Sequence, residues 1–359
     1  MPEKTAKVTL VGDIFPSNLV YTKRFGNGSL FLKNVDNTWA AGTKKLLMNS
    51  DIVFGNLESP LIKDEEFVDS SSFAGSEKFA TTLKDLGFDV VSIANNHILE
   101  QGLEGFLNTQ SALNEAKVNY VGAFNDKKSN IIVIEKNGLR FGLAAFNAIK
   151  DIVNPNLHAD LTLNNIVKTI DEMNTLGLDY KLLSFHWGNE YINIPSHEQI
   201  SLAHSVIDYG ADVIIGHHPH VIQPIERYKN GIIIYSLGNF VFDNPYSKQF
   251  KLGMLIELFF NKGEKIDYKV LEVKLSRKRI NSVFQSSNLN KKLNKYESQM
   301  LNLFDSSEND YIKFYKRKLR QNHLYQRILM KLNILEQLIF SSNRIQLFKN
   351  VFERVSGNI

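Results

Sequence analysis

The chain has no cysteine among its 359 residues. This absence excludes disulfides, thiolate metal sites and cysteine nucleophiles, and it leaves His, Asp, Glu and Asn as candidate metal ligands. No apolar run reaches 18 residues, so the sequence predicts no transmembrane helix. Residues 1–7 lead directly into a strand-like run, without the charged-then-apolar pattern of a signal peptide. We therefore expect a cytoplasmic protein.

A strong charge of one sign is also absent from most of the chain. The net charge is +4, but residues 281–359 hold 13 Lys/Arg and 6 Asp/Glu, while residues 1–280 hold 29 Lys/Arg and 32 Asp/Glu. No Pro/Ser-rich linker interrupts the strand-like runs that end near residue 275. We predict one main domain over residues 1–280 and a basic helical extension over residues 281–359.

Short apolar runs alternate with amphipathic segments through the main domain. This alternation is typical of βαβ units with buried strands. Asn137-Gly138 separates two further strand-like runs and predicts a β-hairpin. The predicted strands are 7–12, 51–54, 90–94, 131–135, 139–146, 181–185, 212–215 and 232–237, and the predicted helices are 39–49, 77–86, 103–116, 163–176 and 198–209.

Polar side chains gather just after the apolar strands, where the loops of an open α/β sheet bring distant residues together. Five of the nine histidines follow three of these strands. The strand ends read Gly12-Asp13, Gly55-Asn56-Leu57-Glu58, Asn95-Asn96-His97, His186-Trp187-Gly188-Asn189-Glu190 and Gly216-His217-His218-Pro219-His220.

Each segment alone has a structural explanation. Gly-Asp and Asn-Asn-His are common in turns and helix caps, and a single histidine is often a buried hydrogen-bonding residue. His218-Pro219-His220 is harder to explain in this way, because two imidazoles in one stiffened loop suit metal coordination. Together the five strand ends favour a metal site.

Carboxylate, amide and imidazole ligands suit Mn, Fe or Zn better than Ca or Mg. A pair of such ions roughly 3.5–4 Å apart can activate water and hold a phosphate. Hydrolysis of a phosphoester is therefore the reaction that these residue types favour.

The ordered motifs resemble the bacterial poly-γ-glutamate capsule-synthesis family, a branch of the calcineurin-like metallophosphoesterase superfamily. The motifs are Gly-Asp, Asn-x-Glu, Asn-Asn-His, His-Trp-Gly-x-Glu-Tyr, Gly-His-His-Pro-His and Ser-Leu-Gly-Asn-Phe, within residues 7–245. The resemblance implies a four-layer α/β/β/α sandwich with a two-metal centre.

The resemblance also implies a role for each motif residue. Asp13 and His220 would bind the first metal, Glu58 would bridge, and Asn96, His186 and His218 would bind the second. His97 would protonate the leaving group. The substrate side would comprise Asn95, Trp187, Glu190, Tyr191 and His217, although core packing is an equal alternative for Trp187 and Tyr191.

Three positions depart from the pattern. Phe15 stands where the superfamily usually has a first-metal histidine, Glu58 where it prefers Asp, and Glu100 where the capsule family usually has Asp. A site with one metal, or a reaction other than simple hydrolysis, stays open.

The C-terminal extension contains a basic amphipathic segment. Lys313, Lys316, Arg317, Lys318 and Arg320 lie among apolar residues and precede the apolar-rich stretch 328–340. Such a helix can lie on an anionic membrane surface or hold a partner in a capsule-synthesis complex. Packing on the sandwich or formation of a homo-oligomer is the alternative, and no nucleic-acid-binding fold is recognisable.

The residue patterns and the family resemblance together suggest three functions, and the capsule setting is implied by the resemblance alone. The first is a phosphoester hydrolase, cytoplasmic or peripheral to the inner face of the membrane, that acts on a phosphorylated small molecule or polymer precursor in capsule biosynthesis. The second is a non-catalytic or weakly catalytic metal-binding subunit of a polymer synthesis or export complex. The third is an amide- or ester-processing metalloenzyme on the same site.

Overall fold

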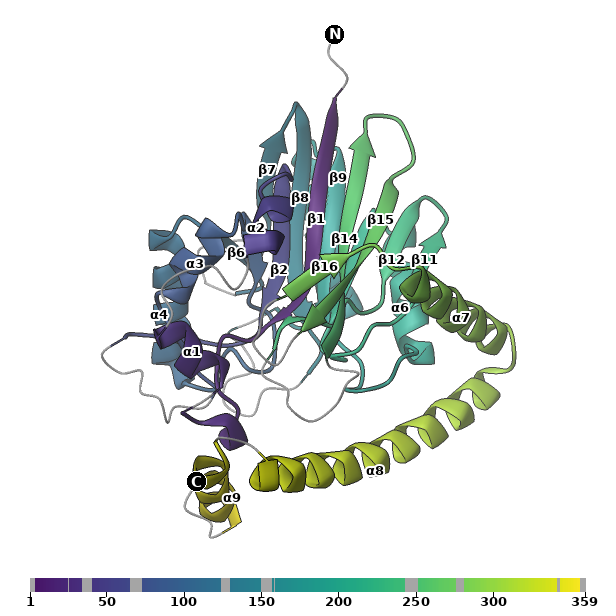
Figure 1. Cartoon of the computed structure of the whole chain (residues 1–359). Coiled ribbons are helices and arrows are strands. Elements are labelled where there is room, and N and C mark those ends of the chain that lie inside the picture. Colours follow the sequence, from purple (N-terminus) through teal and green to yellow (C-terminus); the bar gives the residue numbers. More distant parts are fainter. Residues whose placement is uncertain are drawn as a thin grey trace.

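The computed structural model describes residues 4–24, 26–33, 41–64, 73–123, 130–149, 157, 159–242, 251–275, 281–340 and 343–355. Two β-sheets lie face to face, helices cover their outer faces, and a helical arm extends from the sandwich (Figure 1).

The first sheet has β1 (Thr5–Ile14) near its middle. β1 pairs in parallel with β2 (Ile52–Leu57) and the short β13 (Asn239–Val241), and antiparallel with β14 (Leu252–Asn261). The strand order is β16-β15-β14-β1-β2-β5-β6, with β13 beside β1. The remaining strands of this sheet are β5 (Val90–Ser92), β6 (Asn119–Val121), β15 (Asp267–Leu275) and β16 (Asn281–Phe284).

The second sheet has four parallel strands between two antiparallel edge strands. Its order is β11-β12-β10-β9-β8-β7. The bounds are β7 (Ile132–Lys136), β8 (Leu139–Asn147), β9 (Tyr180–His186), β10 (Val213–His217), β11 (Ile225–Tyr228) and β12 (Gly231–Ile234). A separate pair joins β3 (Leu61–Ile62) and β4 (Gly75–Ser76).

Three apolar clusters define the layers. One joins inward side chains of both sheets, such as Leu10, Phe54, Leu182 and Ile215, and forms the core between them. A second packs the outer face of the first sheet against α2 (Ala41–Leu47), α3 (Phe79–Asp85) and α4 (Gly102–Glu115). A third packs the outer face of the second sheet against α5 (Leu163–Thr175) and α6 (His197–Asp208). The predicted α/β/β/α sandwich is confirmed.

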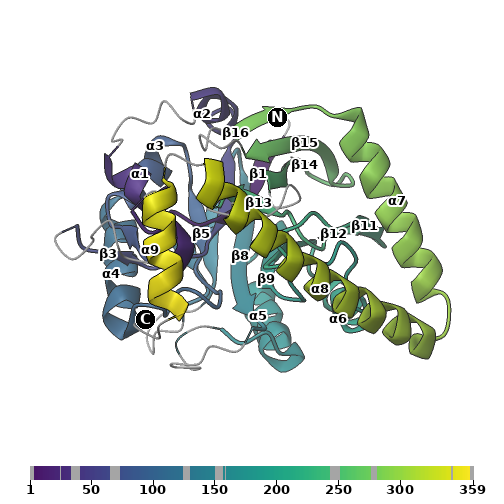
Figure 2. The same ribbon diagram turned by 60° about the horizontal axis from the view of Figure 1, so that its bottom comes forward.

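The C-terminal residues form α7 (Ser287–Phe304), α8 (Glu308–Phe340) and α9 (Arg344–Val355). Tyr311 and Tyr315 of α8 are buried in the third cluster, so the first half of this helix packs on the sandwich. Its second half and α9 continue across the side of the molecule on which η1 (Val20–Thr22) and α1 (Asn27–Lys33) lie (Figure 2). No helix in the described ranges combines the length and apolarity needed to cross a bilayer.

The βαβ units and the hairpin lie where the sequence predicts them. Asn137 and Gly138 have positive φ values of 52° and 75° in the β7–β8 turn, as a tight hairpin requires. β16 pairs with β15 and therefore continues the first sheet past residue 280. The division into residues 1–280 and 281–359 stays a prediction.

Candidate metal centre

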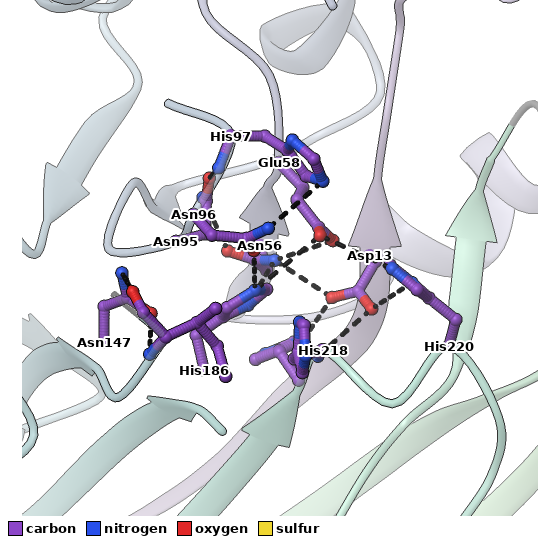
Figure 3. A network of polar contacts seen from close by, with 12 residues as sticks. Asp13, Asn56, Glu58, Asn95, Asn96, His97, Asn147, His186, His218 and His220 are labelled. Atoms are coloured by element: carbon purple, nitrogen blue, oxygen red, sulfur yellow. Dashed lines mark hydrogen bonds and ion pairs between the residues drawn. The ribbon is translucent and has the colours of Figure 1, made fainter. Parts of the chain in front are cut away.

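The polar strand ends meet at one edge of the sandwich. Asp13 lies near the end of β1 and Glu58 follows β2, while Asn96 follows β5 in the same sheet. His186 ends β9, and His218 and His220 follow β10 in the second sheet. Figure 3 shows these side chains pointing toward one another from the two sheets.

A first group of candidate ligands consists of Asp13, Glu58 and His220, whose ligand atoms lie within 4.8 Å of one another. His220 Nδ1 is 3.2 Å from Asp13 Oδ2, and His220 Nε2 is 3.6 Å from Glu58 Oε1. Two carboxylates and one imidazole therefore face a common point.

A second group consists of Glu58, His186 and His218. His186 Nε2 lies 3.6 Å from Glu58 Oε1 and 2.8 Å from Asn96 Oδ1. The amide oxygen of Asn96 is thus beside this group. Because Glu58 belongs to both groups, its carboxylate has the position that a bridging ligand needs.

Glu190, which the sequence predicts on the substrate side, adds a further carboxylate. Glu190, His218 and His220 also have ligand atoms within 4.8 Å of one another. Burial favours a raised pKa, but the charges of His220 and His218 outweigh it and lower the pKa of Glu190. Glu190 is therefore as well placed to bind a metal as to bind a substrate.

Buried amides and an imidazole hold the carboxylates in place. Asn56 Nδ2 donates to Asp13 Oδ1 at 2.9 Å, and Asn95 Nδ2 donates to Asn56 Oδ1 at 3.1 Å. His217 Nδ1 lies 3.0 Å from Asp13 Oδ1, and His220 Nδ1 lies 3.0 Å from Asn239 Oδ1. Such outer contacts orient metal ligands.

Asn56 and Asn239 were missed as site residues, although both lie in motifs that the sequence displays. Asn56 stands two residues before Glu58, and Asn239 follows Gly238 in the Ser-Leu-Gly-Asn-Phe motif. Their position after apolar strands was the available signal.

The backbone around the site is tightly packed and locally strained. A Cβ on Gly12 would lie 1.9 Å from Gly238 O, so only glycine lets β1 approach this loop and lets Asp13 N donate to Gly238 O at 2.9 Å. His218 and His220 have φ values of 94° and 55°. Such conformations cost about 1–3 kcal/mol each in non-glycine residues and gather at functional sites.

The two central carboxyl groups have opposite pKa shifts. Burial favours a raised pKa for Asp13, but hydrogen bonds with His217 and His220 and the charges of these imidazoles hold it well below its usual range. Burial and the negative charge of Asp13 raise the pKa of Glu58 well above its usual range. Glu58 therefore keeps a proton more readily than Asp13.

The pKa values of the histidines in the site are also shifted in opposite directions. Burial opposes the charging of His220, but Glu58 and Asp13 raise its pKa to about 10. Burial and the charge of His220 lower the pKa of His218 to about 4, and burial and His218 lower the pKa of His186 well below its usual value. His186 and His218 are therefore neutral at pH 7, the form that binds metals.

Two buried atoms support the fit to a metal. Glu58 Oε1 and His218 Nδ1 are buried and have no hydrogen-bond partner in the described part of the chain. Leaving such groups unpaired costs about 1–3 kcal/mol each. A divalent ion between the carboxylates and imidazoles would satisfy the oxygen and neutralise the clustered charge.

Metal affinity should rise with pH. Binding requires unprotonated Glu58 and His220, and both have a raised pKa in the metal-free protein, so each bound ion displaces protons. We expect the apparent affinity for Mn²⁺ to increase about tenfold per pH unit for each proton released, up to the pKa of about 10 of His220. Calorimetric titration in buffers of different ionisation enthalpy would count the protons, and an affinity unchanged between pH 6 and 8 would contradict this.

His97 lies beside the ligand groups within an aromatic enclosure. Its Nδ1 is 3.0 Å from Glu100 Oε1, and its Nε2 is 3.3 Å from Asn96 Nδ2. The ring stacks on Phe73 at 5.1 Å and meets Phe15 edge-on at 6.1 Å. Glu100 therefore orients the imidazole with Nε2 toward Asn96, a candidate ligand.

Phe15 packs as an aromatic wall residue. Its ring is fully buried and stacks on Phe242 at 4.8 Å, and Phe242 lies 4.4 Å from the His220 ring. An apolar surface thus borders the first ligand group at the position where the superfamily usually has a histidine. The first group therefore has one imidazole, that of His220, and gains no second nitrogen ligand from position 15.

The residues predicted for the substrate side differ in their surroundings. Trp187 follows the core-packing alternative, because it is 1% exposed in the core outside the second sheet and donates through Nε1 to Tyr235 O at 3.0 Å. Asn95 and His217 are fully buried and position Asn56 and Asp13. Tyr191 hydrogen-bonds Glu190, so it remains beside the site.

Comparison with known proteins gives a family match and several relatives. Residues 7–244 match the family model described as "Bacterial capsule synthesis protein PGA_cap". The chain is similar to "Capsule biosynthesis protein CapA" of Bacillus anthracis, with 36% identity over 260 residues covering 67% of this chain and 61% of that protein. It is also similar to "PGA biosynthesis protein CapA" of Bacillus subtilis (strain 168), with 32% identity, covering 67% and 64%. The chain thus spans under two thirds of either relative.

Among solved structures, the chain is similar to calcineurin-like phosphoesterase YfkN from Bacillus subtilis. The sequence identity is 15%, the TM-score is 0.44, and the match covers 85% of this chain and 100% of that one. A likeness this distant carries no information about activity.

Proposed function

The chain belongs to the bacterial capsule synthesis family PGA_cap, and on this premise we propose that it is a divalent-metal-dependent hydrolase of phosphoesters that acts in the making of a capsule or other surface polymer. The family membership supports the biosynthetic setting. The ligand groups described above support the reaction class.

The observation that carries the proposal is the sharing of Glu58 by two groups of candidate ligands. Asp13 and His220 lie on one side of its carboxylate, and His186 and His218 lie on the other. Paired sites joined by a carboxylate are typical of enzymes that hold both the attacking and the leaving oxygen of a phosphoryl group.

Each residue has a role in this reaction. When bound, the metal ions would supply Lewis-acid polarisation of the phosphoryl oxygens and lower the pKa of a water molecule. Asp13, Glu58, Asn96, His186, His218 and His220 would hold these ions, with Glu190 within reach. His97 would donate a proton to the departing oxygen, and Glu100 would orient it.

The donor set favours Mn, Fe or Zn. Neutral imidazoles and an amide oxygen in the second group suit these ions, whereas Mg and Ca prefer sites made mainly of oxygen ligands. Since Phe15 supplies no nitrogen to the first group, we expect about one tightly held ion per chain and a weaker second one.

A phosphoester panel would test the proposal. We expect protein loaded with Mn²⁺, Fe²⁺ or Zn²⁺ to hydrolyse nitrophenyl phosphate or bis(nitrophenyl) phosphate, and chelation to abolish the activity. The Glu58→Gln variant should be inactive, while Glu272→Gln in β15 should match the unsubstituted protein. If the protein acted only on amides or carboxylic esters, it would be an amide- or ester-processing metalloenzyme and not a phosphoesterase.

The packing of Phe15 favours a second candidate, a metal-binding subunit without catalysis of its own. Its fully buried ring fills the wall beside the first ligand group with apolar surface. Tight binding of one ion together with inactivity on the whole panel would support this role.

A further inference from the structure

The last two helices expose large apolar side chains. Of the 18 large hydrophobic residues exposed in the described chain, nine lie between residues 324 and 352. We call these nine the apolar stripe: Leu324, Tyr325, Ile328, Leu332, Leu335 and Ile339 of α8, and Ile345, Phe348 and Phe352 of α9, each 49–70% exposed.

The helical spacing puts the apolar residues of each helix on one face. Positions 324, 328, 332, 335 and 339 recur every three or four residues, as do 345, 348 and 352, so each set follows one side of its helix. Polar side chains point the other way. Gln326 and Asn350 are 8% and 1% exposed, and Asn350 Nδ2 donates to Tyr21 O and Lys23 O at 3.2 Å. Exposed apolar helix faces of this kind mark interaction sites.

The charge around the apolar stripe is basic. Between residues 320 and 352 the sequence has five Lys/Arg and one acidic residue, Glu336. The five are exposed and have no carboxylate partner among the residues whose side chains the structure describes: Arg320, Arg327, Lys331, Arg344 and Lys349. An apolar helix face bordered by cations is the pattern of helices that lie in the surface of an anionic bilayer. A two-fold contact between identical copies would instead bring like charges together.

The apolar stripe belongs to an arm that touches loops on both sides of the metal centre. Asn189 Nδ2 donates to Tyr315 Oη at 3.1 Å, and Asn322 donates to Tyr191 O, so α8 contacts the loop after β9. The contact of Asn350 fixes α9 to the segment after β1. Figure 2 shows both helices lying across this side of the sandwich.

We propose that the apolar stripe docks the protein onto an anionic lipid surface. The inserted side chains supply apolar burial, and the bordering cations face the lipid headgroups. Docking would turn the side of the molecule that carries the metal centre toward the membrane. The inference goes beyond the proposed function and needs no catalytic activity.

Vesicle co-sedimentation of the full chain would test this. We expect binding to vesicles of phosphatidylglycerol and phosphatidylcholine, and weak binding to phosphatidylcholine alone. Ile328→Ser combined with Leu332→Ser and Leu335→Ser should lower the affinity at least about tenfold. Neutralising Arg327, Lys331, Arg344 and Lys349 to Gln should lower it about fivefold per residue and remove most of its salt dependence.

A matched control neutralises Lys291, Lys292 and Lys295 of α7, which are equally exposed but outside the arm. This variant should bind as the unsubstituted chain does. Equal pelleting with both vesicle types, or no effect of the Ser substitutions, would overturn the proposal. A rise in solution mass with protein concentration that the Ser substitutions abolish would assign the apolar stripe to a second copy instead.

Discussion

Protein carrying His218→Ala or His186→Ala should lose its tightly held transition metal and its hydrolase activity. Both imidazoles are buried and face Glu58 in the second ligand group. Replacing residues that merely orient ligands typically costs 10–100-fold in metal affinity, so removal of a ligand should cost more than about 100-fold. Elemental analysis of protein purified without added metal would measure the occupancy.

Variants of other positions separate this effect from misfolding. His218 has a positive φ of 94°, which glycine adopts without strain, so His218→Gly tests the ligand without a backbone penalty. His323→Ala on the exposed surface of α8 should keep full occupancy. The metal occupancy of Asn56→Ala should fall between these, since Asn56 is not a ligand but orients Asp13 and lies 3.4 Å from Glu58 Oε2 and His186 Nδ1. No Mn, Fe, Zn, Co or Ni above background in the unsubstituted protein, with no activity on re-metallation, would refute the enzyme assignment.

His97→Ala should keep its metal but lose activity in a substrate-dependent way. A general acid typically contributes about 10²–10⁴-fold, and most where the departing oxygen is basic. The loss should therefore be large for an alkyl phosphoester and small for a nitrophenyl ester, whose phenolate leaves without a proton. Rates on the two substrates, measured with metal content on the same preparations, would show the difference.

A second variant of His97 should preserve the packing of the Phe15 and Phe73 rings around this position. His97→Gln keeps bulk between Phe15 and Phe73, so it should reproduce the selective loss without loosening these rings. Glu100→Gln keeps an acceptor for Nδ1 and should cost less. Equal losses on both substrates would indicate that His97 positions the phosphate. Loss of metal would make His97 a ligand.

Much of the fold follows from local patterns in the sequence. Buried strands such as β9 and β10 read as short apolar runs closed by polar residues, and Asn137-Gly138 fixes the β7–β8 hairpin. The loops at the carboxyl ends of neighbouring strands lie at one edge of a sheet, so they bring Asp13, Glu58 and His186 close together. These features depend on neighbours in sequence or on one general property of sheets.

Other features depend on contacts that no local pattern encodes. His186 and Trp187 are adjacent, but successive side chains of an extended segment point to opposite faces, so one reaches the site and the other the core. The roles of Asn56 and Asn239 require the distances to Asp13 and His220. The split of α8 into a packed half and an exposed half depends on how far the sandwich extends beneath it.

The arm also sets an order of events during synthesis. Asn350 contacts Tyr21, which the ribosome makes 329 residues earlier, and His220 is made about 130 residues before Asn350. At about 5–20 residues per second, the six predicted metal ligands exist for roughly 6–26 s before Asn350 of α9 is made. During this interval the segment after β1 lacks its contact with α9, so the ligand residues are present before the last part of the arm can pack beside them.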